Sequence, residues 1–251
     1  MIPPTIDRYF EPFLGAGSVY FNVPCHVEAK ISDVISPLIE CFRMVRDDPV
    51  AVHQAIGKWS VDREAYYRVR SMTSDDAATS AAQFIYLNKT AYNGLYRVNQ
   101  SGSFNVPFGR PKTSNIVGLD DLLEASRILG ERTSIDLRDF RDALSECAAG
   151  DFVYLDPPYV AGHRLNGFVD YNSKLFTWRD QEDLAKEFAR LDSLGAYVVL
   201  SNADHESIRR LYDGFEIRSV SRKSTMAARG AARCESTEIL VVGSSFKEVA
   251  A

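Results

Sequence analysis

The sequence lacks cysteine pairs at zinc-ligand spacing, long hydrophobic runs and an N-terminal signal segment. Its four cysteines are far apart, and its four histidines show no ligand spacing either, which is typical of reduced thiols and argues against a metal site. No apolar run approaches the roughly 18 residues that a membrane-spanning helix needs. The first four residues, Met-Ile-Pro-Pro, contain neither the basic nor the apolar region of a signal peptide. We therefore expect a cytoplasmic protein that binds neither a metal nor a membrane.

The composition is that of a folded protein with a hydrophobic core. Of 251 residues, 45% are hydrophobic and 25% are charged, which excludes intrinsic disorder and a small disulfide scaffold. The length suffices for one large α/β domain, or for one domain that carries a substantial insert. The formal net charge of −5 provides no overall attraction to a polyanion.

Acidic residues are nevertheless distributed unevenly. Residues 77–119 contain no carboxylate, although about six would be expected in 43 residues at the average frequency of this chain, and they include Lys89, Arg97, Arg110 and Lys112. Residues 217–234 are also free of acidic residues and carry five basic ones. Segments without negative charge suit a surface that binds a phosphate backbone. A chance gap in a polar loop explains the same pattern, and charge alone does not separate the two.

Strand and helix patterns alternate along the chain, with an interruption in the middle. Short apolar segments predict strands at residues 8–12, 27–32, 134–137, 151–155, 196–200 and 238–243. Helices are expected from Ser18, over residues 34–47, and from a Thr177–Asp180 capping box to Gly195. The pattern also predicts mostly helix over residues 50–90 and a hairpin over residues 92–111. The expected fold class is α/β, a doubly wound sheet formed by residues 1–50 and 126–251, with residues 51–125 as a helical, hairpin-containing insert.

A glycine turn follows the first expected strand. Phe13-Leu14-Gly15-Ala16-Gly17 is followed, sixteen residues later, by Asp33 at the end of the second strand. Glycines allow a ligand to approach the backbone closely, and a carboxylate on the next strand can accept the hydroxyls of a ribose. A third glycine and a P-loop lysine are missing, so a nucleoside without a phosphate chain is favoured. A turn that binds no ligand remains the alternative reading.

A more specific signal ends the strand at residues 151–155. Asp156-Pro157-Pro158-Tyr159 contains two prolines, which remove two N–H donors and stiffen the turn. A carboxylate, fixed carbonyl acceptors and an aromatic ring are thereby brought together. This set suits a planar amino group that is held by two acceptors while its ring stacks on the aromatic side chain. The alternative is a rigid turn with a structural role only.

These segments stand in the order found in one enzyme family. The blocks are Glu11–Val19, Ser32–Val34, Tyr86–Lys89, Tyr92–Arg97, Phe104–Arg110 and Asp156–Tyr159. Together they resemble the Dam-type DNA adenine N6-methyltransferases, in which the cofactor turn precedes a recognition insert and Asp-Pro-Pro-Tyr follows it. The resemblance covers residues 8–243. It implies a Rossmann-like, S-adenosylmethionine-dependent catalytic domain and a target-recognition insert at residues 51–125.

The resemblance also implies how the cofactor and the target base would be held. S-adenosylmethionine would be bound by Phe13, Gly15, Ala16, Gly17, Asp33, Asp139, Phe140 and Asp156, with Asp33 on the ribose and Asp139 and Phe140 beside the cofactor's adenine. The target adenine would be flipped out of the duplex and stacked on Tyr159. Asp156 and the Pro157 carbonyl would accept hydrogen bonds from its amine, with Pro158 completing the catalytic set. Methyl transfer would be direct, with no metal and no covalent enzyme intermediate.

The same resemblance gives the acid-free insert a role in binding double-stranded DNA. In the family the hairpin enters the major groove, so Arg97 would read a guanine edge, and Leu95 and Pro107 would contact a thymine methyl group. The remaining residues expected to contact DNA are Lys89, Tyr92, Asn93, Asn105 and Arg110. The match favours GATC as the target and allows a cognate restriction endonuclease as a partner. A solvated surface arginine is the alternative for Arg97, and the sequence does not indicate an oligomeric state.

Several features leave alternatives open. The family's Lys-Trp-x-Gly-x-Lys block, which precedes the cofactor turn, is not found here. Either the reading starts late at an internal Met, or a shortened enzyme is real, or tight cofactor binding has been lost; if the loss is real, we expect weakened affinity for S-adenosylmethionine. The rival functions are a catalytically impaired DNA-binding relative and an amine methyltransferase that acts on RNA or on a protein glutamine. Intact Asp156–Tyr159 and Asp33 argue against the first, and the long hairpin has no evident purpose in the second. Residues 218–233 could bind DNA phosphates or form a mobile loop, and Asp170 and Tyr171 could border the substrate pocket.

Overall fold

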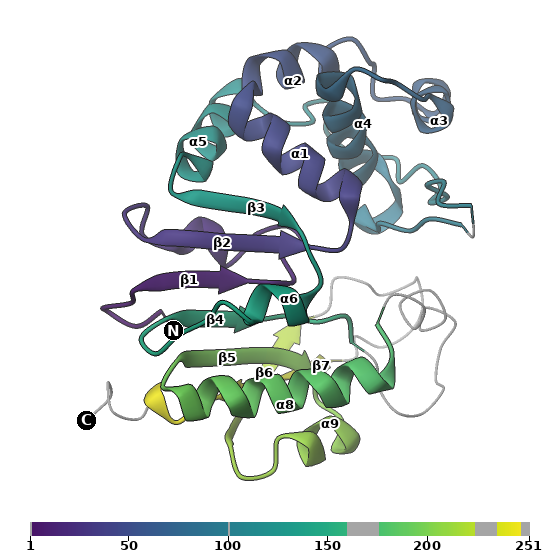
Figure 1. The fold of residues 1–251 in the computed structure, drawn as a ribbon. Coiled ribbons are helices and arrows are strands. Elements are labelled where there is room, and N and C mark those ends of the chain that lie inside the picture. Colours follow the sequence, from purple (N-terminus) through teal and green to yellow (C-terminus); the bar gives the residue numbers. More distant parts are fainter. Residues whose placement is uncertain (1, 100, 160–175, 224–234, 247–251) are drawn as a thin grey trace. The chain divides into compact units, whose positions relative to one another are not determined.

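The computed structural model describes residues 2–99, 101–159, 176–223 and 235–246 (Figure 1). The chain divides into two compact units. The first contains residues 1–34 and 138–251, and the second contains residues 35–137. Asp170, Tyr171, Arg229 and Arg233 lie outside the described residues.

The first unit is built on a mainly parallel sheet. Its strands are β1 (Arg8–Glu11), β2 (Glu28–Asp33), β4 (Phe152–Leu155), β5 (Tyr197–Ala203), β6 (Glu216–Lys223) and β7 (Glu235–Val242). They are ordered β2-β1-β4-β5-β7-β6. The first four are parallel, and β7 runs antiparallel to both β5 and β6. The predicted α/β class and Rossmann-like sheet are confirmed.

The central strands bring the two motifs to one edge of the sheet. Tyr9 and Phe10 in β1 and Phe152 and Val153 in β4 are all buried, as expected for parallel strands that are covered on both faces. Tyr9 pairs in register with Phe152. Parallel strands end at the same edge, and ligands of such sheets bind where the strand order reverses. The glycine turn after β1 and the double-proline turn after β4 therefore lie at the position where this fold binds ligands.

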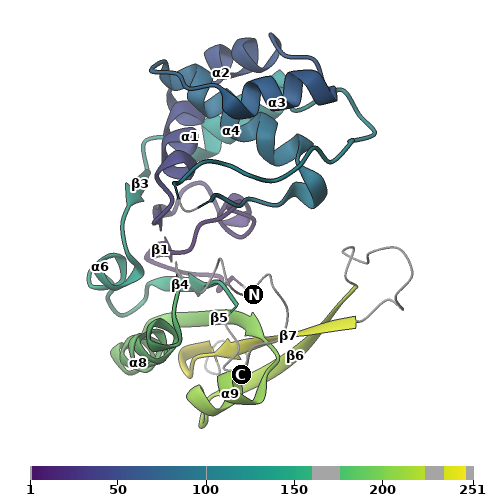
Figure 2. The same ribbon diagram turned by 90° about the vertical axis from the view of Figure 1, so that its right-hand side faces the viewer.

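Among its described residues, this unit contains the α-helices α6 (Phe140–Leu144), α8 (Trp178–Leu194) and α9 (Glu206–Leu211). Figures 1 and 2 both show α6 and α8 on one face of the sheet. The predicted capping box is confirmed, because the Thr177 and Asp180 side chains and backbone N–H groups bond to each other. Gly195, at a φ of 90°, ends α8 as predicted.

The predicted helix from Ser18 is wrong. The structure has only a single 3₁₀ turn, η1 (Tyr20–Asn22), and Val23 is extended with a ψ of 139°. The reason is local, because a proline at position 24 disfavours helical backbone in the residue before it.

The second unit is mainly helical. It contains α1 (Ser36–Asp47), α2 (Pro49–Ile56), α3 (Arg63–Ser71), α4 (Ala77–Thr90), η2 (Tyr92–Gly94), α5 (Leu119–Leu129) and the strand β3 (Thr133–Leu137). The prediction of helices over residues 50–90 is confirmed (Figure 2). The side chains of Asp48, Asp62 and Asp76 cap α2, α3 and α4 by accepting backbone N–H bonds.

The boundaries of this unit are wider than those expected for the recognition insert. The unit runs from Ile35 to Leu137, so it includes α1 and β3, which the sequence patterns placed in the main domain. The functional division at residues 51 and 125 stays a prediction. No helix in the described part of the chain is long and apolar enough to cross a membrane.

Candidate active site and DNA-contact surface

A cavity of about 370 Å³ lies at the ends of the first unit's strands. The residues that line it come from the glycine turn, the double-proline turn and the facing strands: Glu11, Phe13, Leu14, Gly15, Ala16, Ser18, Val19, Tyr154, Asp156, Tyr159, Ser201, Val220, Glu238 and Leu240. The structure thus brings together five of the predicted residues, from segments about 140 positions apart in the sequence. These are Phe13, Gly15, Ala16, Asp156 and Tyr159.

The glycine turn is shaped by left-handed backbone. Gly15 and Gly17 have φ values of 49° and 68°, which glycine adopts without the steric cost of a Cβ. The Gly15 N–H donates to the Asp33 carboxylate at 3.1 Å, and the Gly17 N–H donates to the Leu14 carbonyl at 2.7 Å. A Cβ placed on Gly15 would meet nothing within 4 Å. The turn is therefore open on the side of Gly15, and Asp33, which is 9% exposed, fixes its conformation.

An aromatic cluster packs around Phe13, the first residue of the glycine turn. The Phe13 ring stacks on Phe140, with centroids 5.4 Å apart and an angle of 30°. It also meets Phe176 edge-on at 5.5 Å. Phe140 is buried in the core and is not among the described cavity-lining residues, so it acts on this cavity through Phe13.

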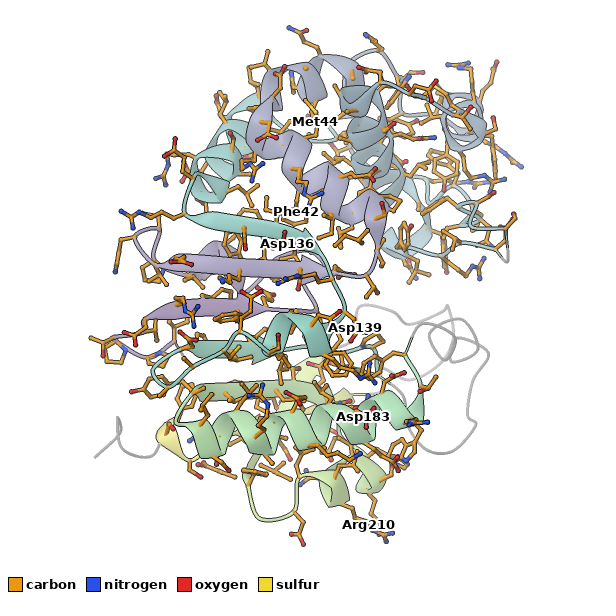
Figure 3. All side chains as sticks on the ribbon, in the orientation of Figure 1. Phe42, Met44, Asp136, Asp139, Asp183 and Arg210 are labelled. Atoms are coloured by element: carbon orange, nitrogen blue, oxygen red, sulfur yellow. The ribbon has the colours of Figure 1, made fainter. Side chains whose placement is uncertain are left out.

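Asp139 stands at the start of α6 and is tied to Arg141. Its carboxylate accepts from the Arg141 backbone N–H at 2.9 Å and from the Arg141 guanidinium at 3.2 Å. The same guanidinium binds Asp180 and Asp183 on α8, and Figure 3 labels Asp139 near α6 and Asp183 on α8. Asp139 does not line the described cavity. Like the role of Phe140, its role beside the cofactor's adenine stays a prediction.

The double-proline turn presents its groups in different directions. Asp156 is exposed and Pro157 is buried, whereas Pro158 and Tyr159 are half-buried. The Tyr159 hydroxyl lies 3.1 Å from the Ser201 hydroxyl on β5. The Pro158 carbonyl accepts a hydrogen bond from the buried Gln181 side chain at 3.2 Å. The sequence patterns identified neither Ser201 nor Gln181, because nothing in their own neighbourhoods indicates these contacts.

The cavity has an acidic lining. Glu11, Asp156 and Glu238 contribute carboxyl groups, and no lysine, arginine or histidine is among its described lining residues. The pKa of Glu11 is raised to about 7, mainly by burial and in smaller part by the nearby Asp156 carboxylate, while hydrogen bonds from the Tyr9 hydroxyl and the Tyr20 N–H act against the rise. Glu11 is only 2% exposed, and its bond to Tyr9 is 2.7 Å long. Such a cavity favours a ligand that carries positive charge.

The predicted hairpin is present in the second unit in an irregular form. In the described residues its backbone pairs through two isolated bridges, Ala91 with Phe108 and Val98 with Phe104, and forms no continuous strand. Six of the eight residues expected to contact DNA are exposed, and Leu95 and Asn105 are half-buried; the exposed ones are Lys89, Tyr92, Asn93, Arg97, Pro107 and Arg110. The hairpin therefore presents these side chains to solvent.

Helix α3 anchors the hairpin. The Val106 carbonyl accepts hydrogen bonds from the Tyr66 hydroxyl at 2.8 Å and from Arg70 at 3.2 Å. Where the two sides converge, a Cβ on Gly109 would lie 2.4 Å from the Ala91 carbonyl oxygen. Only glycine allows this close approach.

The exposed face of the hairpin contains a side-chain hydrogen bond between its two sides and two residues with positive φ. The Arg97 guanidinium donates to the Asn105 side-chain oxygen at 2.7 Å across the hairpin, which holds its fork in one orientation. Asn93 and Arg110 both have a φ of 53°, and they are the only non-glycine residues with positive φ in the described part of the chain. Uncommon backbone of this kind concentrates at functional sites.

Sequence comparison identifies the family. A family model described as "D12 class N6 adenine-specific DNA methyltransferase" matches residues 1–226. The chain belongs to this family. Its resemblance to the Dam-type enzymes, its fold class and its assignment as a DNA adenine methyltransferase are thus confirmed.

Individual relatives agree with this assignment. The methyltransferase is 34% identical over 250 residues to the "Type II methyltransferase M1.LlaDCHI" of Lactococcus lactis subsp. cremoris, covering 96% of this chain and 88% of the relative. It is 36% identical to the "Type II methyltransferase M.MjaIII" of Methanocaldococcus jannaschii, covering 90% and 84%. It is 30% identical to a "DNA adenine methylase" of Vibrio cholerae, covering 95% and 88%. These matches extend over most of both chains, so they include both compact units.

Proposed function

We propose that the protein transfers the methyl group of S-adenosylmethionine to N6 of an adenine flipped out of duplex DNA, with GATC as its site. One observation carries this proposal. The glycine turn and the Asp156–Tyr159 turn, which are far apart in the sequence, share one cavity. A cofactor and a target base need such a shared space to bring their reacting atoms together.

The cavity suits S-adenosylmethionine in size and charge. About 370 Å³ lies within the range of small-molecule sites, roughly 300–1,000 Å³. S-adenosylmethionine supplies an electrophilic methyl group on a positively charged sulfonium. The carboxyl groups of Glu11, Asp156 and Glu238 complement that charge, and the open side of Gly15 leaves room beside the backbone. The described residues contain no cluster of three or more side chains that could hold a metal ion.

The Asp156–Tyr159 turn has the groups to hold and activate an adenine amine. The Asp156 carboxylate and the Pro157 carbonyl accept the two N–H bonds of the amino group, and the Tyr159 ring stacks on the base. These bonds draw the nitrogen toward tetrahedral geometry and turn its lone pair toward the methyl carbon. S-adenosylmethionine would supply the methyl group in one direct displacement: the N–C bond would form as the C–S bond breaks, S-adenosylhomocysteine would leave, and the amino group would lose one proton to the Asp156 carboxylate or to solvent. The residues of the turn thus contribute mainly positioning and charge placement.

The hairpin supplies DNA recognition in this proposal. Arg97, held by Asn105, binds the O6 and N7 atoms of a guanine. Leu95 and Pro107 contact a thymine methyl group, and Tyr92 and Asn93 contact the backbone or the space left by the flipped base. Lys89, Asn105 and Arg110 complete the contact set. The absence of acidic residues from positions 77–119 supports this role, because no carboxylate would repel the phosphates.

The proposal extends to a biological partner. Two of the relatives described above carry the name Type II methyltransferase, which supports a cognate restriction endonuclease for this chain. Protection of GATC-containing plasmid DNA from cleavage by a GATC-specific endonuclease, after expression of the protein, tests both the target site and this role.

A methyl-transfer assay separates the candidate functions. The protein is incubated with S-adenosylmethionine labelled in its methyl group and, in separate reactions, with duplexes that contain or lack GATC, with RNA of the same sequence, and with a glutamine-containing peptide. We expect N6-methyladenine only in the GATC duplex. Label in RNA or peptide supports the alternative substrates, and binding of the duplex without transfer of label supports the catalytically impaired relative.

A further inference from the structure

We infer that Gln181 and Asn202 form a positioning relay that holds the Asp156–Tyr159 turn in its catalytic conformation, an inference that rests on the proposed role of that turn. Gln181 lies in the first turn of α8 and Asn202 near the end of β5. Both side chains belong to residues that are fully buried. The Asn202 amide donates to the Gln181 side-chain oxygen at 3.1 Å, and the Gln181 amide donates to the Pro158 carbonyl at 3.2 Å.

The direction of this relay is determined by the backbone. The oxygen and nitrogen of an amide side chain are hard to distinguish by shape, so their placement follows from hydrogen-bond partners. Here the Asn202 oxygen accepts from the Ala203 backbone N–H at 2.8 Å, and a backbone N–H can only donate. The Asn202 NH₂ must therefore face Gln181. The Gln181 oxygen then faces Asn202, and its NH₂ faces the Pro158 carbonyl.

The relay compensates for a weakness of the double-proline turn. Pro157 and Pro158 have no N–H groups, so neither peptide nitrogen can bond to the surrounding structure. The hydrogen bond at the Pro158 carbonyl instead fixes the plane of the peptide that leads into Tyr159. The contact between the Tyr159 and Ser201 hydroxyls, at 3.1 Å, holds the far end of the ring.

The contact at Tyr159 and the contact at Pro158 both depend on neighbouring residues of β5. Ser201 and Asn202 are neighbours in that strand, and successive side chains point to opposite faces. One therefore reaches the Tyr159 ring and the other reaches Pro158 through Gln181. Fixing the turn at both points sets the directions of the Asp156 carboxylate and the Pro157 carbonyl, the acceptors assigned to the adenine amine.

A purely structural role makes a different prediction from a positioning role. Burying two amides is costly unless their donors and acceptors are paired. Loss of either side chain leaves the other without its partner, so it would lower stability whether the role is structural or positioning. Only the positioning role also predicts slower methyl transfer at unchanged cofactor affinity, because a displacement on the order of 1 Å at the reacting atoms can reduce a rate about 100-fold.

The test compares Gln181→Met with a matched control, Gln83→Met. Gln83 in α4 also donates its side-chain amide to backbone carbonyls, those of Val69 and Met72, at 2.7 and 2.8 Å. Each variant loses two hydrogen bonds of an amide side chain. For each full-length variant, kcat and KM on a GATC duplex, Kd for S-adenosylmethionine and Tm are measured.

We expect Gln181→Met to reduce kcat by about 10- to 100-fold, with Kd for S-adenosylmethionine changed less than threefold. Gln83→Met should lower Tm and leave kcat within twofold of the wild type. A Gln181→Met protein that is folded and keeps wild-type kcat overturns the relay, while wild-type production of N6-methyladenine in the same assay leaves the proposed function intact. Absence of product from the wild type overturns the proposed function itself.

Asn202→Asp supplies a second variant that keeps Gln181. The introduced carboxylate accepts from the Ala203 N–H but cannot donate to Gln181. The Gln181 side chain must then turn its NH₂ toward this carboxylate and its oxygen toward the Pro158 carbonyl, which removes the hydrogen bond at Pro158. We expect a loss of kcat of similar size, and no further loss when Gln181→Met is added, because the two residues act through one contact. Losses that multiply in the double variant contradict the relay.

Discussion

The buried carboxyl group of Glu11 gives the protein a stability that depends on pH. Burial raises the Glu11 pKa from 4.5 to about 7. The folded protein keeps this proton up to about pH 7, whereas the unfolded chain loses it near pH 4.5. The unfolded state therefore binds fewer protons in this window, and the free energy of unfolding falls as the pH rises through it.

The size of the effect follows from the gap between the two pKa values. At about 1.4 kcal/mol per pH unit, the rise from 4.5 to about 7 corresponds to a loss of about 3 kcal/mol. Because Glu11 is 2% exposed, solvent screens this effect little. Glu11→Gln removes the titration while keeping a side chain of the same shape that can still accept from the Tyr9 hydroxyl.

Urea unfolding of the wild type and Glu11→Gln, from pH 4.5 to pH 8, measures this difference. Contributions from other groups cancel when the two proteins are compared at each pH. We expect the variant to gain about 3 kcal/mol of stability relative to the wild type between the two ends of the range. If the difference in unfolding free energy between the two proteins does not change with pH, the raised pKa of Glu11 is refuted.

The same carboxyl group should respond to a cationic ligand. A positive charge in the cavity favours the ionised form, so binding of S-adenosylmethionine should lower the Glu11 pKa and release a proton near neutral pH. Calorimetry in buffers with different ionisation enthalpies measures this release. Glu11→Gln serves as the control, in which the proton release should be lost.

Two further predictions concern the hairpin. Gly109→Ala should weaken duplex binding at least tenfold and leave affinity for S-adenosylmethionine unchanged, because a Cβ 2.4 Å from the Ala91 carbonyl oxygen forces the two sides of the hairpin apart. Fluorescence anisotropy measures the affinity for the duplex, and calorimetry measures the affinity for S-adenosylmethionine. Unchanged duplex binding would count against the hairpin as the DNA-contact surface. Arg97→Ala should relax the choice of base at one guanine of the site, by roughly 10- to 100-fold for a bidentate contact worth about 1–3 kcal/mol. Methylation rates on duplexes substituted at each position test this, and equal weakening on all sequences would identify Arg97 as a phosphate contact instead.

Elements with local causes were predictable from the sequence. The start of α8 was predicted because the Thr177–Asp180 capping box lies within four residues, and its end because Gly195 provides the left-handed residue that closes a helix. The double-proline turn was recognised for the same reason, since its stiffness and its acceptors come from adjacent residues.

Other elements depend on distant parts of the chain. Strand β6, Glu216–Lys223, was not predicted, because it carries charged and hydroxyl side chains and gains its structure by pairing with β7. The first part of the segment expected either to bind phosphates or to form a loop is therefore strand. The pKa of Glu11 and the Gln181–Asn202 relay were also beyond sequence analysis, because burial and the contacts between α8 and β5 create them.

Replacement of Asp156 shows whether its carboxylate is required for methyl transfer to adenine. Single-turnover methylation of a GATC duplex and binding of the same duplex are measured for the wild type and Asp156→Ala. We expect the variant to bind the duplex measurably and to form no detectable N6-methyladenine, because the adenine amine has lost its carboxylate acceptor. Substantial methylation by Asp156→Ala would show that Asp156 does not hold the adenine amine during transfer.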